Sequence, residues 1–196
     1  MEQRASLGYA SKAKKISAAI EGPIFLTGFM GTGKTRIGRV LATRMRRMFL
    51  DTDRLVEESA GRTISEIFAA EGEDRFRQFE HDCVSEAAAR ADAVIALGGG
   101  AIADERNWEV IRRAGVVVAL EASVDTILKR VSRRNDRPLL AGLSREQKRA
   151  RIAELLAARA PYYGRADIRL KTGDKQTPEA TAGELVRLME RWCEDR

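Results

Sequence analysis

Short apolar runs alternate along this chain with longer stretches in which apolar residues recur every three or four positions. The short runs are rich in Val, Ile and Leu, and most contain no polar residue, so they predict strands that are buried on both faces. We expect five such strands, at residues 24–27, 48–50, 93–97, 116–120 and 168–170.

The longer stretches carry the three-to-four residue spacing of amphipathic helices. We expect helices at residues 34–46, 63–70, 73–91, 107–114, 123–134, 145–160 and 178–194. Buried strands separated by helices predict an α/β fold with a central five-stranded parallel sheet between two helical layers, a three-layer α/β/α arrangement. In such a sheet, ligands bind at the carboxyl ends of the strands.

The length of 196 residues suits one enzyme-sized domain and is short for two. We expect residues 1–21 to form a flexible N-terminal extension and residues 22–196 to form a single domain, with excursions at 54–91 and 133–148. The first twenty residues lack the apolar segment and cleavage site of a secretory signal. No apolar stretch approaches the roughly 18 residues of a membrane span, so we expect no membrane association.

Residues 28–35 read Gly-Phe-Met-Gly-Thr-Gly-Lys-Thr, a complete phosphate-binding loop between a predicted strand and a predicted helix. Its glycines, among them Gly31 and Gly33, let the backbone N–H groups of the loop, including that of Thr32, approach the phosphates of a nucleotide. Lys34 supplies a positive charge to the β- and γ-phosphate oxygens, and Thr35 offers a hydroxyl to Mg²⁺. A glycine-rich turn without a ligand is the weaker alternative.

Two carboxylates, Asp51 and Asp53, follow the second predicted strand at alternate positions. They lie at the same sheet edge as the phosphate loop, so one can serve Mg²⁺ and the other a substrate. The alternative is that Asp53 caps a helix that begins near Arg54.

Three consecutive glycines, Gly98, Gly99 and Gly100, follow the third predicted strand, where many nucleotide hydrolases place an aspartate. A structural turn rarely needs more than one or two glycines. The sequence therefore predicts a ligand that lies against bare backbone at this point.

The predicted helix 73–91 has an apolar side and a charged side. Phe76 and Phe79 have the spacing of core residues, whereas Arg77, Glu80 and His81 project elsewhere. Arg77 can bind a substrate carboxylate, and Glu80, three residues later, can hold its guanidinium in place. We interpret His81, the only histidine, as a solvated residue rather than an acid–base catalyst.

The net charge of +6 is concentrated between Lys129 and Arg151, where nine basic residues accompany two acidic ones. Such a cluster suits polyphosphate, RNA or a solvated helix face. Aromatic residues for base stacking are absent from this window, so we expect no nucleic-acid partner. Cys83 and Cys193 are far apart and lack metal-ligand spacing, which favours free thiols in a cytoplasmic protein.

Taken in order, these motifs resemble the shikimate kinase family. The resemblance runs from about Gly22 to the last helix and rests on residues 28–35, 50–53, 72–73, 76–77, 80, 97–101, 137–140 and 159–163. It implies a P-loop kinase fold and transfer of the γ-phosphoryl group of ATP to the 3-hydroxyl of shikimate, a step towards chorismate and the aromatic amino acids. It also implies Mg²⁺ as cofactor. We expect a monomer.

The resemblance further implies roles for individual residues. Asp53 would bind the substrate hydroxyls and orient or deprotonate the attacking one, and Asp51 would reach Mg²⁺ through water beside Thr35. The shikimate carboxylate would be bound by Arg77 and Arg159, and its hydroxyl side would face Gly98, Gly99 and Gly100. The remaining implied residues are Arg137, on a mobile lid over ATP, Arg130, stacked on adenine, and Gln176, in the adenine-contacting loop.

Three other functions are weighed against this one. A gluconate-type kinase would share the phosphate loop but should lack the acidic pair together with both carboxylate-binding arginines. A nucleoside monophosphate kinase has an anionic acceptor and needs no base such as Asp53. A catalytically silent relative would be expected to have lost Lys34, Asp53 or Arg137, and all three are present. Arg159 also has a structural alternative, which is to balance the negative end of its helix.

Overall fold

A computed structural model describes residues 13, 15–132, 140 and 142–196. These residues contain one sheet of five parallel strands in the order β2-β3-β1-β4-β5. The strands are β1 (Ile24–Thr27), β2 (Met48–Asp51), β3 (Ala93–Ala96), β4 (Val116–Glu121) and β5 (Ile168–Lys171). All five predicted strands are confirmed, with ends that differ by at most one residue.

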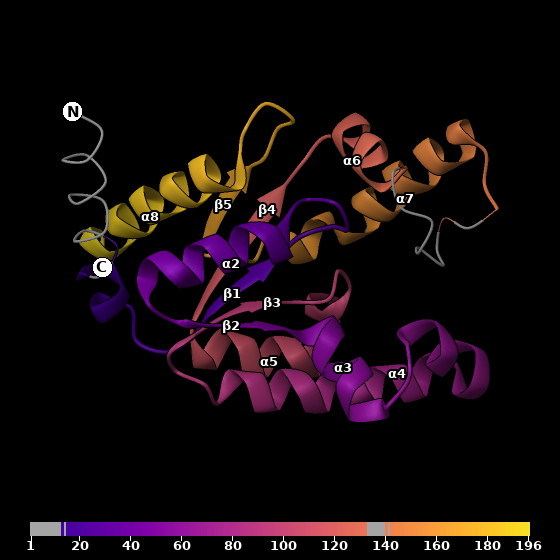
Figure 1. Cartoon of the computed structure of the whole chain (residues 1–196), viewed down its shortest axis with the longest axis horizontal. Helices are drawn as coiled ribbons and strands as arrows, with labels where there is room; N and C mark the ends of the chain where they lie inside the picture. The colour runs from indigo at the N-terminus through magenta and orange to yellow at the C-terminus, as the bar shows by residue number, and fades with distance from the viewer. Residues whose placement is uncertain (1–12, 14, 133–139, 141) are drawn as a thin grey trace.

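Helices cover both faces of this sheet, so the predicted three-layer α/β/α fold is confirmed (Figure 1). The helical elements are α2 (Lys34–Met45), α3 (Thr52–Ala60), α4 (Ile64–Ala88), the short 3-10 helix η1 (Ala101–Ala103), α5 (Glu105–Ala114), α6 (Val124–Val131), α7 (Arg145–Tyr163) and α8 (Pro178–Glu194). In Figure 1, α2 and α8 lie on one side of the strands and α4 and α5 on the other.

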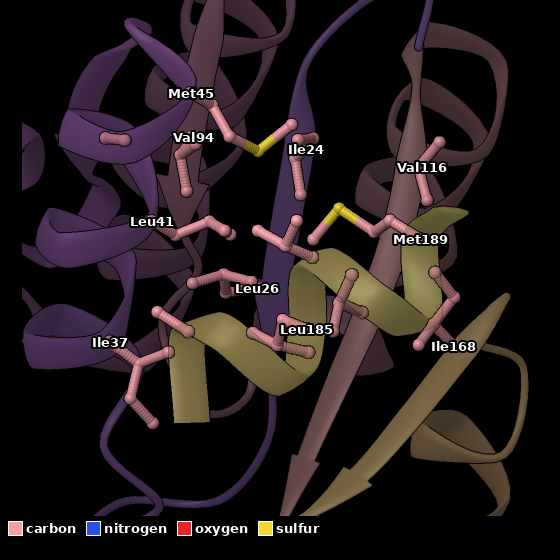
Figure 2. Packing of buried hydrophobic residues seen from close by; sticks show 14 of the residues in the cluster. Ile24, Leu26, Ile37, Leu41, Met45, Val94, Val116, Ile168, Leu185 and Met189 are labelled. Carbon is pink, nitrogen blue, oxygen red and sulfur yellow. The ribbon is translucent and has the colours of Figure 1, made fainter. Parts of the chain in front are cut away.

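The strands send alternate side chains into two separate cores because successive residues of a strand face opposite sides of the sheet. In β1, Ile24 and Leu26 pack with α2 and α8, whereas Phe25 packs with α4 and α5. Figure 2 shows the first of these cores, where Leu41 of α2 and Leu185 of α8 meet Leu26 over the sheet. Burial on both faces explains why the inner strands β1, β3 and β4 contain almost no polar residues, whereas the edge strand β5 alternates buried residues with the exposed Arg169 and Lys171.

Helix α3 is absent from the sequence-based prediction, which treated 54–91 as an excursion. It is short and largely polar, and of its nine residues only Thr52 and Val56 are buried. Helix α4 covers two predicted helices that are joined through a kink at Gly72, where φ is 81° and ψ is −176°. A positive φ of this kind favours glycine, so the predicted break between residues 70 and 73 is a real change of direction.

The described end of the N-terminal segment is packed, whereas the sequence led us to expect a flexible tail up to residue 21. Residues 15–19 are helical, and Ala13, Ile16 and Ile20 are buried in the core that contains α2 and α8. Side chains before residue 22 therefore contribute to the same core as the rest of the domain.

Arg47, at the start of β2, joins this segment to the domain. Its guanidinium donates hydrogen bonds to the carbonyl oxygens of Ser17 at 2.6 Å, Ile20 at 2.7 Å and Gly22 at 2.6 Å. It also donates to the Ser17 hydroxyl at 2.9 Å. These carbonyls include those at the negative end of the short helix, where a cation is electrostatically favourable.

Candidate active site

A cleft of about 1260 Å³ lies at the carboxyl ends of the strands, as expected for a parallel sheet. Most of the predicted site residues line it, although they come from seven separate segments of the chain. Those residues are Gly31, Thr32, Gly33, Lys34, Thr35, Asp51, Asp53, Arg77, Gly99, Gly100, Arg130, Arg159 and Gln176. Arg137 and half of the predicted lid, residues 133–139 and 141, lie outside the described residues.

The phosphate loop joins β1 to α2 and requires glycine for its shape. Gly28 has a φ of 132°, and a Cβ there would lie 2.2 Å from the carbonyl oxygen of Leu120. Gly33 is the left-handed residue that precedes α2, and Thr32 is buried. Lys34 Nζ donates hydrogen bonds to the carbonyl oxygens of Gly28 at 2.7 Å and Phe29 at 3.2 Å. The lysine charge is thus held over its own loop.

Thr35 and Asp51 meet at one side of the phosphate loop. The Thr35 hydroxyl donates a hydrogen bond to Asp51 Oδ2 at 2.8 Å, although sixteen positions separate the two residues. Asp51 is the last residue of β2 and precedes α3. A hydroxyl and a carboxylate are hard oxygen ligands of the kind that Mg²⁺ prefers.

Asp53 lies in the first turn of α3, close to Gly98 and Glu80. A Cβ at Gly98 would lie 2.7 Å from Asp53 Oδ1 and 2.9 Å from Glu80 Oε1. The alternative that Asp53 caps a helix near Arg54 is wrong, because α3 begins at Thr52 with Asp51 as its N-cap residue. The first of the three glycines therefore leaves room for two carboxylates.

Arg77 is held by two carboxylates of its own helix. Its Nη1 lies 2.6 Å from Glu80 Oε2, and its Nη2 lies 2.8 Å from Glu73 Oε1. The expectation that Glu80 holds this guanidinium is confirmed. Burial raises the pKa of Glu80 above its ordinary value of 4.5, and nearby Asp53 adds to this rise, while Arg77 opposes it. The two partner carboxylates raise the pKa of Arg77 against the effect of burial, so its charge is permanent.

Arg77 and Arg159 converge on Gly100. A Cβ at Gly100 would lie 3.3 Å from Arg77 Nη1 and 3.5 Å from Arg159 Nη2. Arg159 Nη1 also donates a hydrogen bond to the carbonyl oxygen of Gly99 at 3.1 Å. Helix α7 continues beyond Arg159 to Tyr163, so balancing the end of that helix is not what this arginine does.

The positions of the three glycines differ. Gly99 and Gly100 line the cleft, whereas Gly98 is buried beneath it and its N–H donates to the Thr52 hydroxyl at 2.9 Å. This N–H is therefore already used inside the protein. Of the three glycines, only Gly99 and Gly100 are therefore placed to offer backbone groups to a ligand.

Arg130 connects the phosphate loop with the loop that follows β5. Its guanidinium donates to the carbonyl oxygens of Gly31 at 2.9 Å and Gly173 at 2.8 Å, and it lies 3.5 Å from Asp174. Gln176 accepts a hydrogen bond from the Gly173 N–H at 3.1 Å. Hydrogen bonds at the edge of a guanidinium do not occupy its planar faces, which are the surfaces that stack on aromatic rings.

His81 is not among the residues that line the cleft. Its Nδ1 lies 2.9 Å from Oδ1 of the buried Asn107, whose amide donates to the carbonyl oxygen of Ala101 at 3.0 Å. His81 is thus partly buried and hydrogen-bonded rather than solvated, and it remains outside the site.

Sequence reasoning missed several residues of the cleft. Phe76 is buried, as expected of a core residue, but it also lines the cleft beside Phe68, with ring centroids 4.7 Å apart. Phe68 is 38% exposed, and an exposed aromatic ring in a polar helix was the available signal. Glu73 as a second partner of Arg77 was also missed, although its i, i+4 spacing could have revealed it.

The comparisons with known proteins agree with this geometry. The family model described as shikimate kinase matches residues 30–190. The shikimate kinase of Chlorobium chlorochromatii is 44% identical over 174 residues, which cover 86% of this chain and 91% of that protein. That of Symbiobacterium thermophilum is 44% identical over 171 residues and covers 86% of this chain and 97% of that protein.

The chain belongs to the shikimate kinase family. Among solved structures, the shikimate kinase from Acinetobacter baumannii in complex with shikimate is 36% identical, has a TM-score of 0.81 and covers 87% of this chain and 93% of its own. A gluconokinase from Sinorhizobium meliloti has a TM-score of 0.58 at 17% identity, which shows a shared fold alone. The predicted family, the P-loop kinase fold and the ATP-dependent shikimate kinase activity are thus confirmed.

No helix within the described part of the chain is long and apolar enough to cross a membrane.

Proposed function

We propose that this shikimate kinase binds its two substrates at opposite ends of the cleft and transfers the γ-phosphoryl group of ATP directly to the 3-hydroxyl of shikimate. The observation that carries this proposal is the convergence of Arg77 and Arg159 on Gly100, close to the Asp53 carboxylate and facing the phosphate loop. Two guanidinium groups suit a carboxylate, and a carboxylate at the other side suits hydroxyl groups.

At the acceptor end, Arg77 and Arg159 bind the carboxylate of shikimate. The N–H groups of Gly99 and Gly100 lie against its ring, and Asp53 accepts a hydrogen bond from the hydroxyl that attacks. Glu73 and Glu80 fix Arg77 before the substrate arrives, so less side-chain freedom is lost on binding. Phe68 and Phe76 add apolar surface at the same end.

At the nucleotide end, the N–H groups of Gly31, Thr32 and Gly33 bind the phosphates of ATP. Lys34 exchanges its carbonyl partners for phosphate oxygens, to which an ammonium group binds more strongly. The adenine ring stacks on Arg130 beside the loop that contains Gln176.

The residues around Thr35 fit a magnesium ion. Among the described residues, no group of three His, Cys, Asp or Glu side chains could hold a metal on its own. Mg²⁺ commonly takes one or two protein oxygens and completes its shell with waters and phosphate oxygens. Thr35 would hold it directly and Asp51 through water; when bound, the ion supplies positive charge that offsets the charge of the phosphates.

Asp53 orients the 3-hydroxyl and accepts its proton as the new P–O bond forms and the bond to the ADP oxygen breaks. Closure of residues 133–148 over ATP, with the Arg137 guanidinium against the transferring group, remains a prediction from the sequence. Exclusion of water by such a closure would limit hydrolysis of ATP.

The test is ADP release from the purified protein with Mg²⁺ and ATP, in parallel reactions with shikimate, gluconate, AMP or no acceptor. We expect release with shikimate alone, and phosphorus NMR should place the phosphate on the 3-hydroxyl. Release with gluconate or AMP would overturn the assignment of the acceptor end. ATP binding without release with any acceptor would instead support a catalytically silent relative.

We expect the reaction to take place in the cytoplasm. We also expect the protein to be a monomer. Cys83 and Cys193, the chain's two cysteines, are both free thiols in the structure, as is usual in a reducing compartment. Size-exclusion chromatography with light scattering tests the oligomeric state.

A further inference from the structure

The turn that contains the three glycines is held by four side chains, of which only Arg159 lines the cleft. The Thr52 hydroxyl accepts a hydrogen bond from the N–H of Gly98. The Asn107 amide donates a hydrogen bond to the carbonyl oxygen of Ala101 at 3.0 Å. Between them, the carbonyl oxygen of Gly99 accepts two hydrogen bonds, both from α7. The turn therefore takes its position from side chains of three separate helices.

One of the two donors to Gly99 is Tyr163, to which the sequence analysis assigned no role. Its hydroxyl lies 2.8 Å from the Gly99 oxygen, whereas Arg159 Nη1 lies at 3.1 Å. The Tyr163 side chain is buried, with a residue exposure of 6%, and it does not line the cleft. Burial raises the pKa of Tyr163, so the hydroxyl keeps its proton and remains a donor.

Arg159 and Tyr163 lie one helical turn apart, at the i and i+4 positions that share a face of a helix. The arginine reaches the cleft and the tyrosine stays behind it, yet both end at the same carbonyl oxygen. Helix α7 thus contacts the glycine turn through one residue that faces the substrate and one that does not.

The planarity of the peptide bond transmits this contact to the cleft. In a trans peptide, the carbonyl of Gly99 and the N–H of Gly100 point in opposite directions. Fixing the Gly99 oxygen against α7 therefore fixes the direction of the Gly100 N–H. Gly100 lines the cleft, and the guanidinium groups of Arg77 and Arg159 approach it.

We propose that Tyr163 is a positioning residue for the acceptor, whose hydroxyl holds the Gly99 peptide in place so that Gly100 and Arg159 present a fixed geometry to the carboxylate of shikimate. This inference rests on the acceptor site described under the proposed function. When the substrate carboxylate draws the Arg159 guanidinium towards itself, the Tyr163 hydroxyl keeps the Gly99 oxygen satisfied. Without Tyr163, the Gly99 carbonyl oxygen would lose its hydrogen-bond donor whenever Arg159 moved towards the substrate. This cost would keep Arg159 at Gly99 and so oppose binding of shikimate.

The test is Tyr163→Phe, which keeps the ring in the core and removes only the hydroxyl. The matched control is Tyr162→Phe at the next position, where the ring lies against the guanidinium of Arg165. We expect Tyr163→Phe to raise the KM for shikimate by about three- to tenfold and to change the KM for ATP less than twofold. We expect Tyr162→Phe to leave both constants unchanged.

An unchanged KM for shikimate in Tyr163→Phe would overturn the inference, and so would equal increases in both KM values, which indicate general loosening of the fold. A double-mutant cycle with Arg159→Lys adds a second readout, because two residues that share one carbonyl should have non-additive effects. Additive effects on the KM for shikimate would contradict the inference. Absence of shikimate-dependent turnover in the unsubstituted protein would instead contradict the proposed function itself.

Discussion

The two ends of the cleft are built in different ways. The nucleotide end is mostly backbone from one continuous stretch, residues 28–35, whose carbonyls bind Lys34 and Arg130. The acceptor end consists of charged side chains from α3, α4 and α7 around a turn of glycines, and both of its arginines are held by other residues. The phosphate loop is thus one local motif, whereas the acceptor end is assembled from segments that only the folded domain brings together.

This difference predicts that substitutions at the two ends will separate the kinetic constants of the two substrates. Changes at the acceptor end should alter shikimate binding or the chemical step and leave ATP binding intact. Changes at the nucleotide end should do the reverse.

The largest effect is expected for Asp53→Asn. The amide keeps the size of the side chain but cannot accept the proton of the attacking hydroxyl, so kcat should fall by about a thousandfold or more. ATP affinity, measured by calorimetry, should remain within about twofold because Asp53 belongs to the other end of the cleft. Turnover near the level of the unsubstituted protein would remove Asp53 from the chemical step.

Arg77→Ala should weaken shikimate binding by about 1.5–3 kcal/mol, because a hydrogen bond to a charged group is lost. This free energy corresponds to a rise in the KM for shikimate of roughly 10- to 150-fold. Arg75→Ala on the same helix is the control, since Arg75 is exposed and does not line the cleft. Steady-state kinetics with shikimate as the varied substrate measures both. Equal effects of the two substitutions would show that only the overall charge of the helix matters.

The raised pKa of Glu80 predicts opposite pH trends for stability and for binding. A carboxyl group whose pKa is higher in the folded state contributes stability fully below its unfolded pKa, and that contribution is lost as the pH rises through the folded pKa. Acidification through the folded pKa, above the ordinary value of 4.5, therefore favours folding at this residue but removes the charge that holds Arg77.

Glu80→Gln tests this prediction because it removes the titration. At neutral pH we expect a thermal midpoint equal to or above that of the unsubstituted protein and a KM for shikimate that is about three- to tenfold higher. The dependence of this KM on pH above the ordinary carboxyl value of 4.5 should also become weaker, because the titrating group is gone. Glu86→Gln is the control, since Glu86 is an exposed residue of the same helix and does not line the cleft. A lowered midpoint together with an unchanged KM would contradict the role given to Glu80.

The smallest effect is expected at the nucleotide end. Arg130→Lys replaces a planar guanidinium with a single ammonium group, which cannot bind the carbonyls of Gly31 and Gly173 together as the fork does. We expect the KM for ATP to rise by about two- to fivefold, with the KM for shikimate unchanged. A larger change for shikimate than for ATP would contradict the separation of the two ends.

The same contrast explains what the sequence could predict. The strands and the phosphate loop depend on local patterns, and they lie where they were expected. The Thr52 hydroxyl and the Gly98 N–H are 46 positions apart, and Tyr163 is 64 positions from Gly99, so neither contact leaves a local pattern. Helix α3 was missed because it is short and buries only two of its nine residues. Lys34, the acidic pair and Arg77 were identified from their own positions and spacing, whereas Arg130 and Arg159 were identified through the family motifs. Of the residues that hold this site in place, Glu80 was predicted and Glu73 and Tyr163 were not.

Arg47 has a consequence for how the N-terminal segment tolerates change over evolution. Three of its partners there are carbonyl oxygens, which every amino acid supplies whatever its side chain. The exposed positions Ala18 and Ala19 are therefore free to vary among descendants of this sequence without loss of the attachment. The attachment depends instead on the buried Ile16 and Ile20 and on Arg47 itself, so a segment with little recognisable sequence similarity could keep the same place in the fold.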